Sequence, residues 1–312
     1  FANAREARNL ADAACRAQSQ RVSRLAAAGA VNDDEYLILR PEDVPKGVAS
    51  GASQSLEEVL SELESLQGLA SVKDSITRVY NRIQAQKLAG ETETIGKHYQ
   101  FLGNPGTGKT TVARIMAKVF NSLGMLPTAK LVEMDRSKLV GQYVGQTAPL
   151  VNQRVDEALG GVLFIDEAYT LNQGQDDKWG HEAIDTLLKR LEDDKGKFVA
   201  IIAGYTRNME DFISTNPGLK SRFSERIVFE DYSPYELFAA FQSMAKKKNL
   251  VFAEGFAEAL AERLQDLYEN RSADFGNMRT IRQLFEASEE NKAGGIMALQ
   301  KAGAGEDELR KE

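Results

Sequence analysis

The chain has 312 residues, of which 42% are hydrophobic, and its formal net charge is −7. A chain of this length can bury one full-size core and a smaller satellite domain. Its single cysteine, Cys15, excludes an internal disulfide and a thiolate zinc site, and its two histidines are His98 and His181. The acidic balance disfavours nucleic-acid binding, and no apolar run reaches the roughly 20 residues of a membrane helix. We therefore expect a cytoplasmic protein with no nucleic-acid partner and no membrane insertion.

An internal repeat links the two ends of the chain. Residues 1–30 align without a gap with residues 275–304. A repeat at this distance indicates two copies of one unit. We therefore expect residues 1–30 to be the C-terminal helical remnant of a preceding module, and residues 31–54, with their Pro, Gly and Ser positions, to be a linker. The coinciding positions are Phe1/Phe275, Asn3/Asn277, Arg5/Arg279, Arg8/Arg282, Leu10/Leu284, Ala13/Ala287, Leu25/Leu299 and Ala28-Gly29-Ala30/Ala302-Gly303-Ala304.

A glycine-rich segment, residues 103–110, fits the phosphate-binding pattern G-x-x-x-x-G-K-[ST]. It lies between the apolar residues 99–102, typical of a strand, and a helical pattern. In this context backbone N–H groups face a triphosphate, Lys109 reaches the β- and γ-phosphates, and Thr110 offers a hydroxyl to Mg²⁺. The motif predicts binding of a nucleoside triphosphate with Mg²⁺. The predicted nucleotide contacts are Asn104, Pro105, Gly106, Thr107, Gly108, Lys109, Thr110 and Thr111.

A second apolar run, residues 161–165, is typical of a buried parallel strand and ends in Asp166 and Glu167. One carboxylate at the end of such a strand can hold Mg²⁺, and the next can orient the attacking water. We assign Asp166, together with Thr110, to the metal. Glu167 is assigned to the water, so that the two motifs together predict hydrolysis.

Three more strands are predicted, over residues 130–134, 198–205 and 226–229, with helical patterns between them. This order predicts an α/β fold in which a parallel sheet is flanked by crossover helices. We expect this large domain to occupy residues 55–231. Residues 232–312 carry no strand pattern and are expected to form a small helical domain.

Tyr205 stands at the polar tip of one of these strands, with Thr206 and Asn208 as neighbours. The carboxyl ends of parallel strands meet at one edge of a sheet, so Tyr205 is expected beside the γ-phosphate. We therefore count Tyr205, with Lys109 and Glu167, among the catalytic residues, as a sensor of the nucleotide state.

These motifs together resemble the AAA+ ATPases of the CbbX/CfxQ group. That group includes red-type Rubisco activases, the sporulation protein K type and the C-terminal ATPase domain of the type VII secretion protein EccA. The resemblance covers about residues 57–300, and it is specific for an ATPase but not for a substrate. It implies ATP and Mg²⁺ as cofactors and a P-loop large domain followed by a helical lid. The segments that carry it are residues 103–114, 139–147, 161–169, 201–205 and 216–223.

The resemblance implies that Arg222 is a catalytic arginine finger, which reaches into the site of a neighbouring subunit. A finger acting in trans requires an oligomer, and the family resemblance implies a hexameric ring of identical chains. Lys220 and Arg226 are alternatives for this role. An ordinary surface arginine is the competing interpretation of Arg222.

Tyr143, Val144 and Gly145 match the aromatic pore loop of such rings, which grips a protein client through shape and apolar area. The competing interpretation is a tyrosine packed on the sheet. Gly141 and Gly145 favour a flexible loop.

Two further nucleotide contacts are implied by the resemblance. Arg279 matches the second sensor arginine, although Arg279 and Arg282 also fit the charged face of a helix. Gly68 and Leu69 match the segment that wraps the adenine, although a plain helix–turn–helix connection fits them equally well on spacing.

Three functions remain compatible with the sequence. The first is an ATP-driven remodeller that pulls a protein client through a ring pore, and Rubisco activation is one choice within it. The second is an ATP-dependent switch or scaffold that does not thread, such as a secretion-system component. The third is a nucleic-acid motor, which the acidic balance disfavours. Tyr143 discriminates between the first two.

Overall fold

The structure is a computed structural model that describes residues 37–43, 55–89, 97–174 and 176–301, with a few residues between 14 and 25. It divides into two units, residues 1–53 and 54–312. Most of the first repeat copy, including all of residues 1–13, lies outside the described residues, as do residues 302–304 of the second copy.

Within the first unit, the segment 37–43 is bonded to the helical residues before it. Arg21 pairs with Asp43 at 2.9 Å, and the side-chain amide of Gln18 donates to the carbonyl of Ile38 at 3.1 Å. A short 3₁₀ helix, η2 (Pro41–Asp43), ends in that Asp43, whose side chain is buried. This segment falls inside the expected linker but forms part of the first unit.

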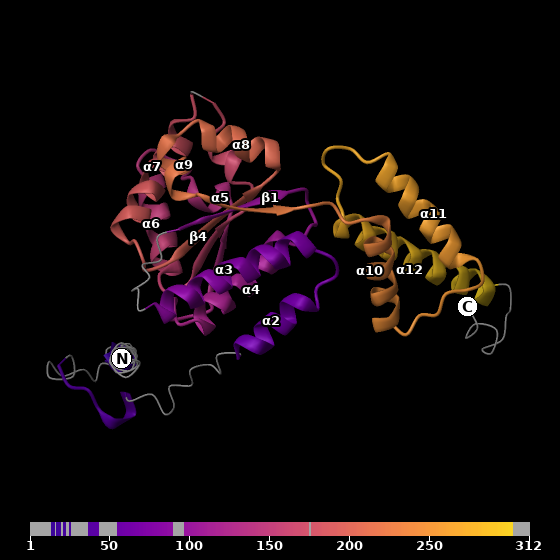
Figure 1. Cartoon of the computed structure of the whole chain (residues 1–312), viewed down its shortest axis with the longest axis horizontal. Coiled ribbons are helices and arrows are strands. Elements are labelled where there is room, and N and C mark those ends of the chain that lie inside the picture. The colour runs from indigo at the N-terminus through magenta and orange to yellow at the C-terminus, as the bar shows by residue number, and fades with distance from the viewer. Residues whose placement is uncertain are drawn as a thin grey trace. The chain divides into compact units, whose positions relative to one another are not determined.

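The second unit contains a five-stranded sheet in which every neighbouring pair is parallel (Figure 1). The strand order is β2-β3-β4-β1-β5. This arrangement confirms the predicted α/β fold, and the strand predictions are correct to within one residue at each end. The strands are β1 (Tyr99–Gly103), β2 (Leu131–Met134), β3 (Val162–Ile165), β4 (Val199–Gly204) and β5 (Glu225–Phe229).

Alternate residues of each central strand face two separate hydrophobic clusters, because successive side chains of a strand point to opposite faces. Phe101 and Phe164 belong to the cluster on one face of the sheet, which is covered by α2 (Leu56–Glu64), α3 (Ala70–Leu88) and α4 (Lys109–Ser122). Leu102 and Leu163 pack on the other face, with the remaining helices of the large domain. These are α5 (Arg136–Leu139), α6 (Thr147–Ala158), η3 (Ala168–Leu171), α7 (Lys178–Asp193), α8 (Thr206–Ser214) and α9 (Pro217–Arg222).

Among the residues that the structure describes, three helices follow β5 and form the lid, which Figure 1 shows as a separate group. They are α10 (Pro234–Lys247), α11 (Phe256–Glu269) and α12 (Met278–Lys301). Ser233 and Glu236 form a reciprocal capping box at the start of α10. Phe241 packs its ring against Phe285 at 5.2 Å, which joins α10 to α12.

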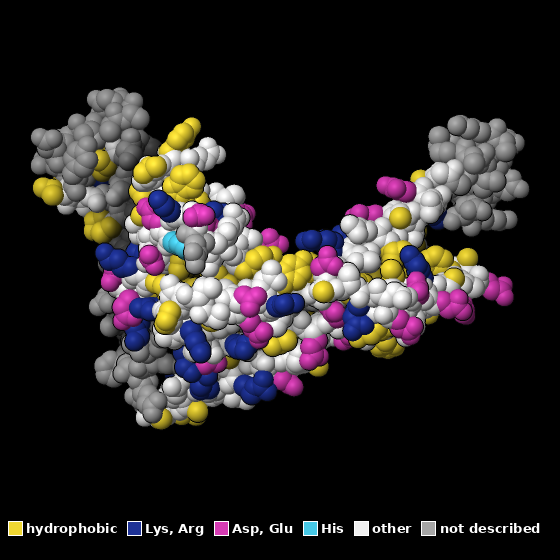
Figure 2. Space-filling view, turned by 90° about the horizontal axis from the view of Figure 1, so that it is seen from above, with side chains coloured by type: hydrophobic (Ala, Val, Ile, Leu, Met, Phe, Trp, Pro, Cys, Tyr) yellow, Lys and Arg dark blue, Asp and Glu magenta, His cyan; other side chains and the backbone are white. Residues whose placement is uncertain are grey.

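The surface of this chain carries both signs of charge. On the face shown in Figure 2, Lys and Arg side chains are interspersed with Asp and Glu side chains. Within the described part of the chain, no helix combines the length and the apolar character needed to span a membrane.

Candidate nucleotide-binding site

The glycine-rich segment forms a tight loop between β1 and α4. Gly106 and Gly108 have φ angles of 70° and 92°, which an L side chain adopts only with strain. Lys109, the first residue of α4, turns back across the loop and donates to the carbonyls of Gly103 at 2.9 Å and Asn104 at 2.8 Å. Burial lowers the pKa of Lys109, while Asp166 and Glu167 oppose this shift.

A cavity of about 550 Å³ opens beside this loop. Its walls come from the loop, the carboxyl ends of β3 and β4, the α2–α3 connection and the lid. Arg282, which with Arg279 also fits the charged face of a helix, lines it as well. The predicted residues that line it are Leu69, Pro105, Gly106, Gly108, Lys109, Thr110, Thr111, Asp166, Glu167, Tyr205 and Arg279.

Three predicted nucleotide contacts are not among the lining residues. The Thr107 side chain is fully buried, and its hydroxyl donates to the carbonyl of Asn104 at 2.8 Å. The Asn104 amide donates to Asp231 at 2.9 Å. Gly68 packs against the lid, because a Cβ there would lie 2.3 Å from Glu236 Oε1. Residues 68–69 connect α2 to α3, and Leu69 lines the cavity, while a contact of this segment with adenine stays a prediction.

The two carboxylates after β3 differ in their surroundings. Asp166 is half-buried, and its N–H donates to Met134 at the end of β2. Glu167 is exposed and has a φ of 48°. Such a backbone costs a non-glycine residue about 1 kcal/mol or more, so it needs support from its surroundings. Thr170 supplies it by donating to the Glu167 carbonyl through both its N–H and its hydroxyl.

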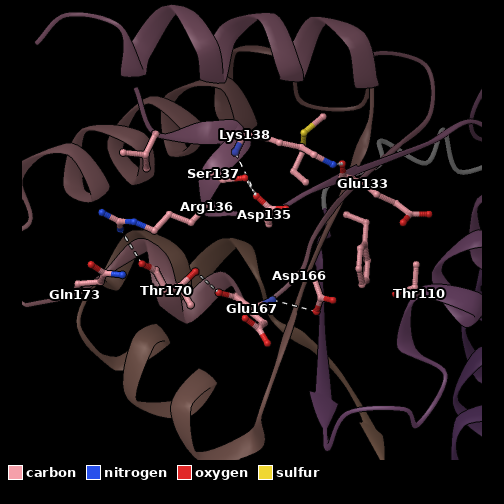
Figure 3. Close-up of a pocket in the computed structure, with 13 residues that line it drawn as sticks. Thr110, Glu133, Asp135, Arg136, Ser137, Lys138, Asp166, Glu167, Thr170 and Gln173 are labelled. Atoms are coloured by element: carbon pink, nitrogen blue, oxygen red, sulfur yellow. Dashed lines mark hydrogen bonds between the residues drawn. The ribbon is translucent and has the colours of Figure 1, made fainter. Parts of the chain in front are cut away.

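A second cavity, of about 760 Å³, shares Thr110, Asp166 and Glu167 with the first. Figure 3 shows these residues at one side of it and the residues of α5 at the other. Arg136, which lines this cavity, donates to Asp177 at 2.7 and 2.9 Å and to the carbonyl of Thr170 at 2.7 Å. The guanidinium lowers the pKa of Asp177 to about 2. Because Glu167 lines both cavities, it lies at the border between them.

The donors around Thr110 and Asp166 suit Mg²⁺. A hydroxyl and a carboxylate are hard oxygen ligands, and Mg²⁺ characteristically completes its shell with phosphate oxygens and water. Within the described ranges, no group of three or more His, Cys, Asp or Glu side chains is placed to hold a metal ion by itself. The protein ligands present thus fit an ion that arrives with a polyphosphate.

Tyr205 lies at the carboxyl end of β4 and begins α8 as its N-cap. The hydroxyl of Tyr205 can donate to a phosphate oxygen, because a tyrosine with its ordinary pKa of about 10 is protonated at neutral pH, and burial raises the pKa of Tyr205 further. Its ring lies 6.1 Å from that of Tyr169, whose pKa burial raises to about 12. Gly204 leaves room for this pair, since a Cβ there would lie 2.8 Å from the Tyr169 ring.

The sequence did not predict the polar junction that joins the loop to the lid. Asp231 accepts from Asn104 of the loop at 2.9 Å and from Asn277 of the lid at 2.8 Å. The Asn277 side chain is fully buried and also accepts the N–H of Tyr232 at 2.9 Å. Asn277 had one signal in the sequence, because it coincides with Asn3 in the internal repeat.

Arg222 and the Tyr143 loop lie apart from the nucleotide cavity. Arg222 ends α9 beside the amino end of β1, whereas the glycine-rich loop follows the carboxyl end of the same strand. At 3.3–3.4 Å per residue, β1 separates the two by roughly 17 Å. Tyr143 and Val144 have exposed fractions of 69% and 88%, so Tyr143 is not packed on the sheet of this chain.

Comparisons with known proteins agree with this geometry. The family described as "ATPase family associated with various cellular activities (AAA)" matches residues 99–231. Stage V sporulation protein K of Bacillus subtilis is 40% identical to the chain over 238 residues, which cover 75% of this chain and 74% of that protein. The chain belongs to the AAA ATPase family. The resemblance that the motifs indicated is therefore confirmed.

Two further relatives are longer than this chain. ESX-1 secretion system protein EccA1 of Mycobacterium tuberculosis is 42% identical over 255 residues, 77% of this chain and 44% of that protein. ESX-3 secretion system protein EccA3 of the same species is 38% identical over 267 residues, 80% of this chain and 42% of that protein. The chain thus spans less than half the length of the EccA proteins.

The AAA lid domain matches two separate segments, residues 1–55 and 233–311. Among solved structures, a mutant of RuvB from Thermotoga maritima superposes with a TM-score of 0.51 at 21% identity, covering 80% of this chain and 70% of that one. This likeness shows the shared AAA fold, with its parallel sheet and helical lid.

Proposed function

We propose that the chain hydrolyses ATP to ADP and phosphate with the help of Mg²⁺. The observation that supports this most directly is the meeting of Lys109, Thr110, Asp166 and Glu167 in one cavity with Arg279 of the lid. Membership of the AAA ATPase family supports the general activity. The residue roles are our inference from their positions.

Each group has a distinct task in this proposal. Lys109 leaves the carbonyls of Gly103 and Asn104 and binds the β- and γ-phosphates. Thr110 and Asp166 would hold Mg²⁺, which neutralises charge on the phosphates when bound. Glu167, at the border of two open spaces, orients a water for attack on the γ-phosphorus.

Two variants separate binding from hydrolysis. Lys109→Ala is expected to lose ATP binding, because the ammonium group beside the phosphate-binding loop is removed. Glu167→Gln is expected to keep ATP affinity within about twofold and to lose turnover by about 10²-fold or more, since only the group that orients the water changes. Binding of a fluorescent ATP analogue and steady-state phosphate release measure the two effects.

Glu133→Gln is the matched control for this pair. Glu133 lines the second cavity and has no role in the proposal, so its removal tests whether loss of a nearby negative charge is sufficient. A Glu167→Gln protein with normal turnover would contradict the assignment of the water-orienting role.

We also propose that the active form is a ring, in which Arg222 completes the site of the neighbouring subunit. Arg222 lies at the strand end opposite its own nucleotide cavity, as a finger acting in trans requires. Its guanidinium donates to Glu192 at 3.1 Å and to the Gly218 carbonyl at 3.4 Å, and the two side chains of the pair, Arg222 and Glu192, are 28% and 64% exposed. Such a partly exposed pair contributes little, so it can be exchanged for a phosphate.

The ring would act on a protein client through the Tyr143 loop. Two neighbouring exposed apolar side chains, Tyr143 and Val144, stand on a loop whose base is fixed. The Gly141 N–H donates to the Thr147 hydroxyl at 3.1 Å, and the Tyr143 N–H to the Gln146 side chain at 3.3 Å. A gripping residue on a fixed base can transmit a pull from the sheet to the client.

Substitution of Tyr143 distinguishes threading from a switch or scaffold. Tyr143→Ala is expected to keep basal ATP hydrolysis and to lose stimulation by a client, while Tyr143→Phe retains most of it because ring area makes the contact. A photoreactive residue at position 143 tests contact directly. Normal remodelling by Tyr143→Ala would favour the switch or scaffold.

We further propose that the first unit is the end of a second AAA module. The support is the lid-domain match to residues 1–55, together with the repeat between residues 1–30 and 275–304. The named relatives serve sporulation and secretion, two different processes, so they do not indicate one client.

A further inference from the structure

The segment that carries Arg222 is short and has few anchors of its own. Helix α9 has six residues, from Pro217 to Arg222, and begins with a cap from Asn216 to the Gly218 N–H at 2.8 Å. An isolated helix of this length is not stable in water. The place of its last residue must therefore be set by contacts from outside the helix.

Leu219 is buried in the core below α9, and the end of the helix is also held by β1 and the residue before it. The His98 N–H donates to the carbonyl of Arg222 at 3.2 Å. Two residues further along, the side-chain amide of Gln100 donates to the carbonyl of Phe223. Two consecutive carbonyls at the end of α9 are thus held by one edge of β1.

The His98 ring strengthens this attachment. Its centroid lies 5.6 Å from that of Phe223, which is fully buried, and 6.1 Å from that of Phe198. Its Nδ1 accepts the N–H of Ala200 at 3.0 Å, which requires an unprotonated Nδ1. The ring therefore links β4, β1 and the residue after Arg222 in a fixed orientation.

Buried polar side chains need a reason in an otherwise apolar strand. His98 and Gln100 are 3% and 6% exposed, and burying such groups is costly unless they are hydrogen-bonded. Apolar residues of similar size would fill the same space without that cost. What the polar side chains add is a fixed place for residues 222–223.

The same strand also leads into the phosphate-binding loop. Tyr99–Gly103 has Arg222 beside its amino end, and at its carboxyl end Gly103 accepts a hydrogen bond from Lys109. We propose that Gln100 and His98 are positioning residues that set Arg222 for the neighbouring subunit's active site. Because β1 connects the two, a shift of the chain's own phosphate-binding loop would shift that arginine as well. This inference rests on the proposed role of Arg222 as a finger acting in trans.

The test uses mixed rings, since a positioning residue for the finger affects only the neighbour's site. Gln100→Met keeps the side-chain length and removes the donor to Phe223. We expect its turnover to fall roughly tenfold, with ATP affinity within about twofold of the unchanged protein. Adding Lys109→Ala subunits, which cannot hydrolyse ATP but carry an intact finger segment, should then restore turnover at the Gln100→Met sites.

Three further proteins make the result decisive. Arg222→Ala subunits measure the rescue that full loss of the finger permits. His98→Phe keeps an aromatic ring against Phe223 and serves as a second variant should Gln100→Met fold poorly. Phe101→Leu, a packing defect on the same strand, should not be rescued by Lys109→Ala, because it damages its own subunit.

The two proposals can fail separately. Rescue of Gln100→Met to the extent seen for Arg222→Ala supports the inference. Rescue of Arg222→Ala without rescue of Gln100→Met and His98→Phe, or normal turnover in both variants, overturns it. Absence of rescue for Arg222→Ala in rings shown to be mixed overturns the finger itself, and the inference with it.

Discussion

The two ends of β1 are built differently, although only five residues separate them. At the carboxyl end the chain meets the lid through the Asn104–Asp231–Asn277 junction, beside an open cavity. At the amino end, the side chains of His98 and Gln100 are buried and bonded to their surroundings. We expect the junction that borders the nucleotide cavity to rearrange when phosphate arrives, and the one inside the core at the amino end to keep its geometry. One strand thus offers a movable contact to its own nucleotide and a fixed contact to Arg222.

We expect the largest effect on ATP affinity at the carboxyl end of β1, where the loop and the lid leave the least space. Gly106 has a φ of 70°, and a Cβ there would lie 2.2 Å from the Gly276 carbonyl oxygen and 2.9 Å from the Arg279 nitrogen. Gly106→Ala should therefore push the loop and the lid apart. We expect the Kd for ATP to rise at least about 200-fold, or roughly 3 kcal/mol, as measured by calorimetric titration.

The control for this substitution is Gly255→Ala. Gly255 has a similar φ of 79°, but nothing lies within 4 Å of its Cβ position. It thus carries the same backbone strain without the clash. Equal losses of ATP affinity in the two variants would show that strain alone is responsible and that contact between loop and lid is irrelevant.

A smaller effect is expected from the junction itself. Asp231→Ala removes the acceptor of Asn104 and leaves the buried amide of Asn277 with weaker partners, the carbonyls of Pro105 at 3.4 Å and Phe275 at 3.0 Å. Hydrogen bonds to a charged group contribute about 1.5–3 kcal/mol, so we expect ATP affinity to fall about 30-fold. Glu230→Ala removes the adjacent exposed carboxylate and should change affinity less than twofold.

The sequence could predict the features that depend on residues close together in the chain. Strands such as residues 161–165 were predictable because a strand buried on both faces is a continuous apolar run. Lys109, Thr110, Asp166 and Glu167 were predictable as ligands of phosphate, metal and water because their motifs carry local chemistry. All four line the cavity.

The junctions were not predictable, because they depend on residues that only the tertiary fold brings together. Asn104 and Asp231 are 127 positions apart, and Gln100 and Phe223 are 123 positions apart. A single glutamine in a strand does not reveal whether it faces water or a carbonyl. The left-handed backbone of Glu167 was equally invisible, since it is imposed by Thr170 and η3 rather than by the Glu side chain.

The smallest effect is a pH dependence of stability, which arises from His98 at the amino end of β1. Burial lowers the pKa of His98 from 6.5 to about 4, with a further lowering from Arg222. Below pH 6.5 the unfolded chain binds a proton that the folded chain excludes, so stability falls as pH decreases until about pH 4. Between pH 7.5 and 5.5 this contributes about 1 kcal/mol of lost stability.

His98→Phe should remove that dependence of stability on pH in urea unfolding curves measured across this range, because a phenyl ring does not titrate. His181→Ala, which changes the other histidine, should leave the slope in place. If the slope persisted in His98→Phe, the ring of His98 would already be charged or open to water in the fold, and the picture of a fixed, buried amino end of β1 would be wrong.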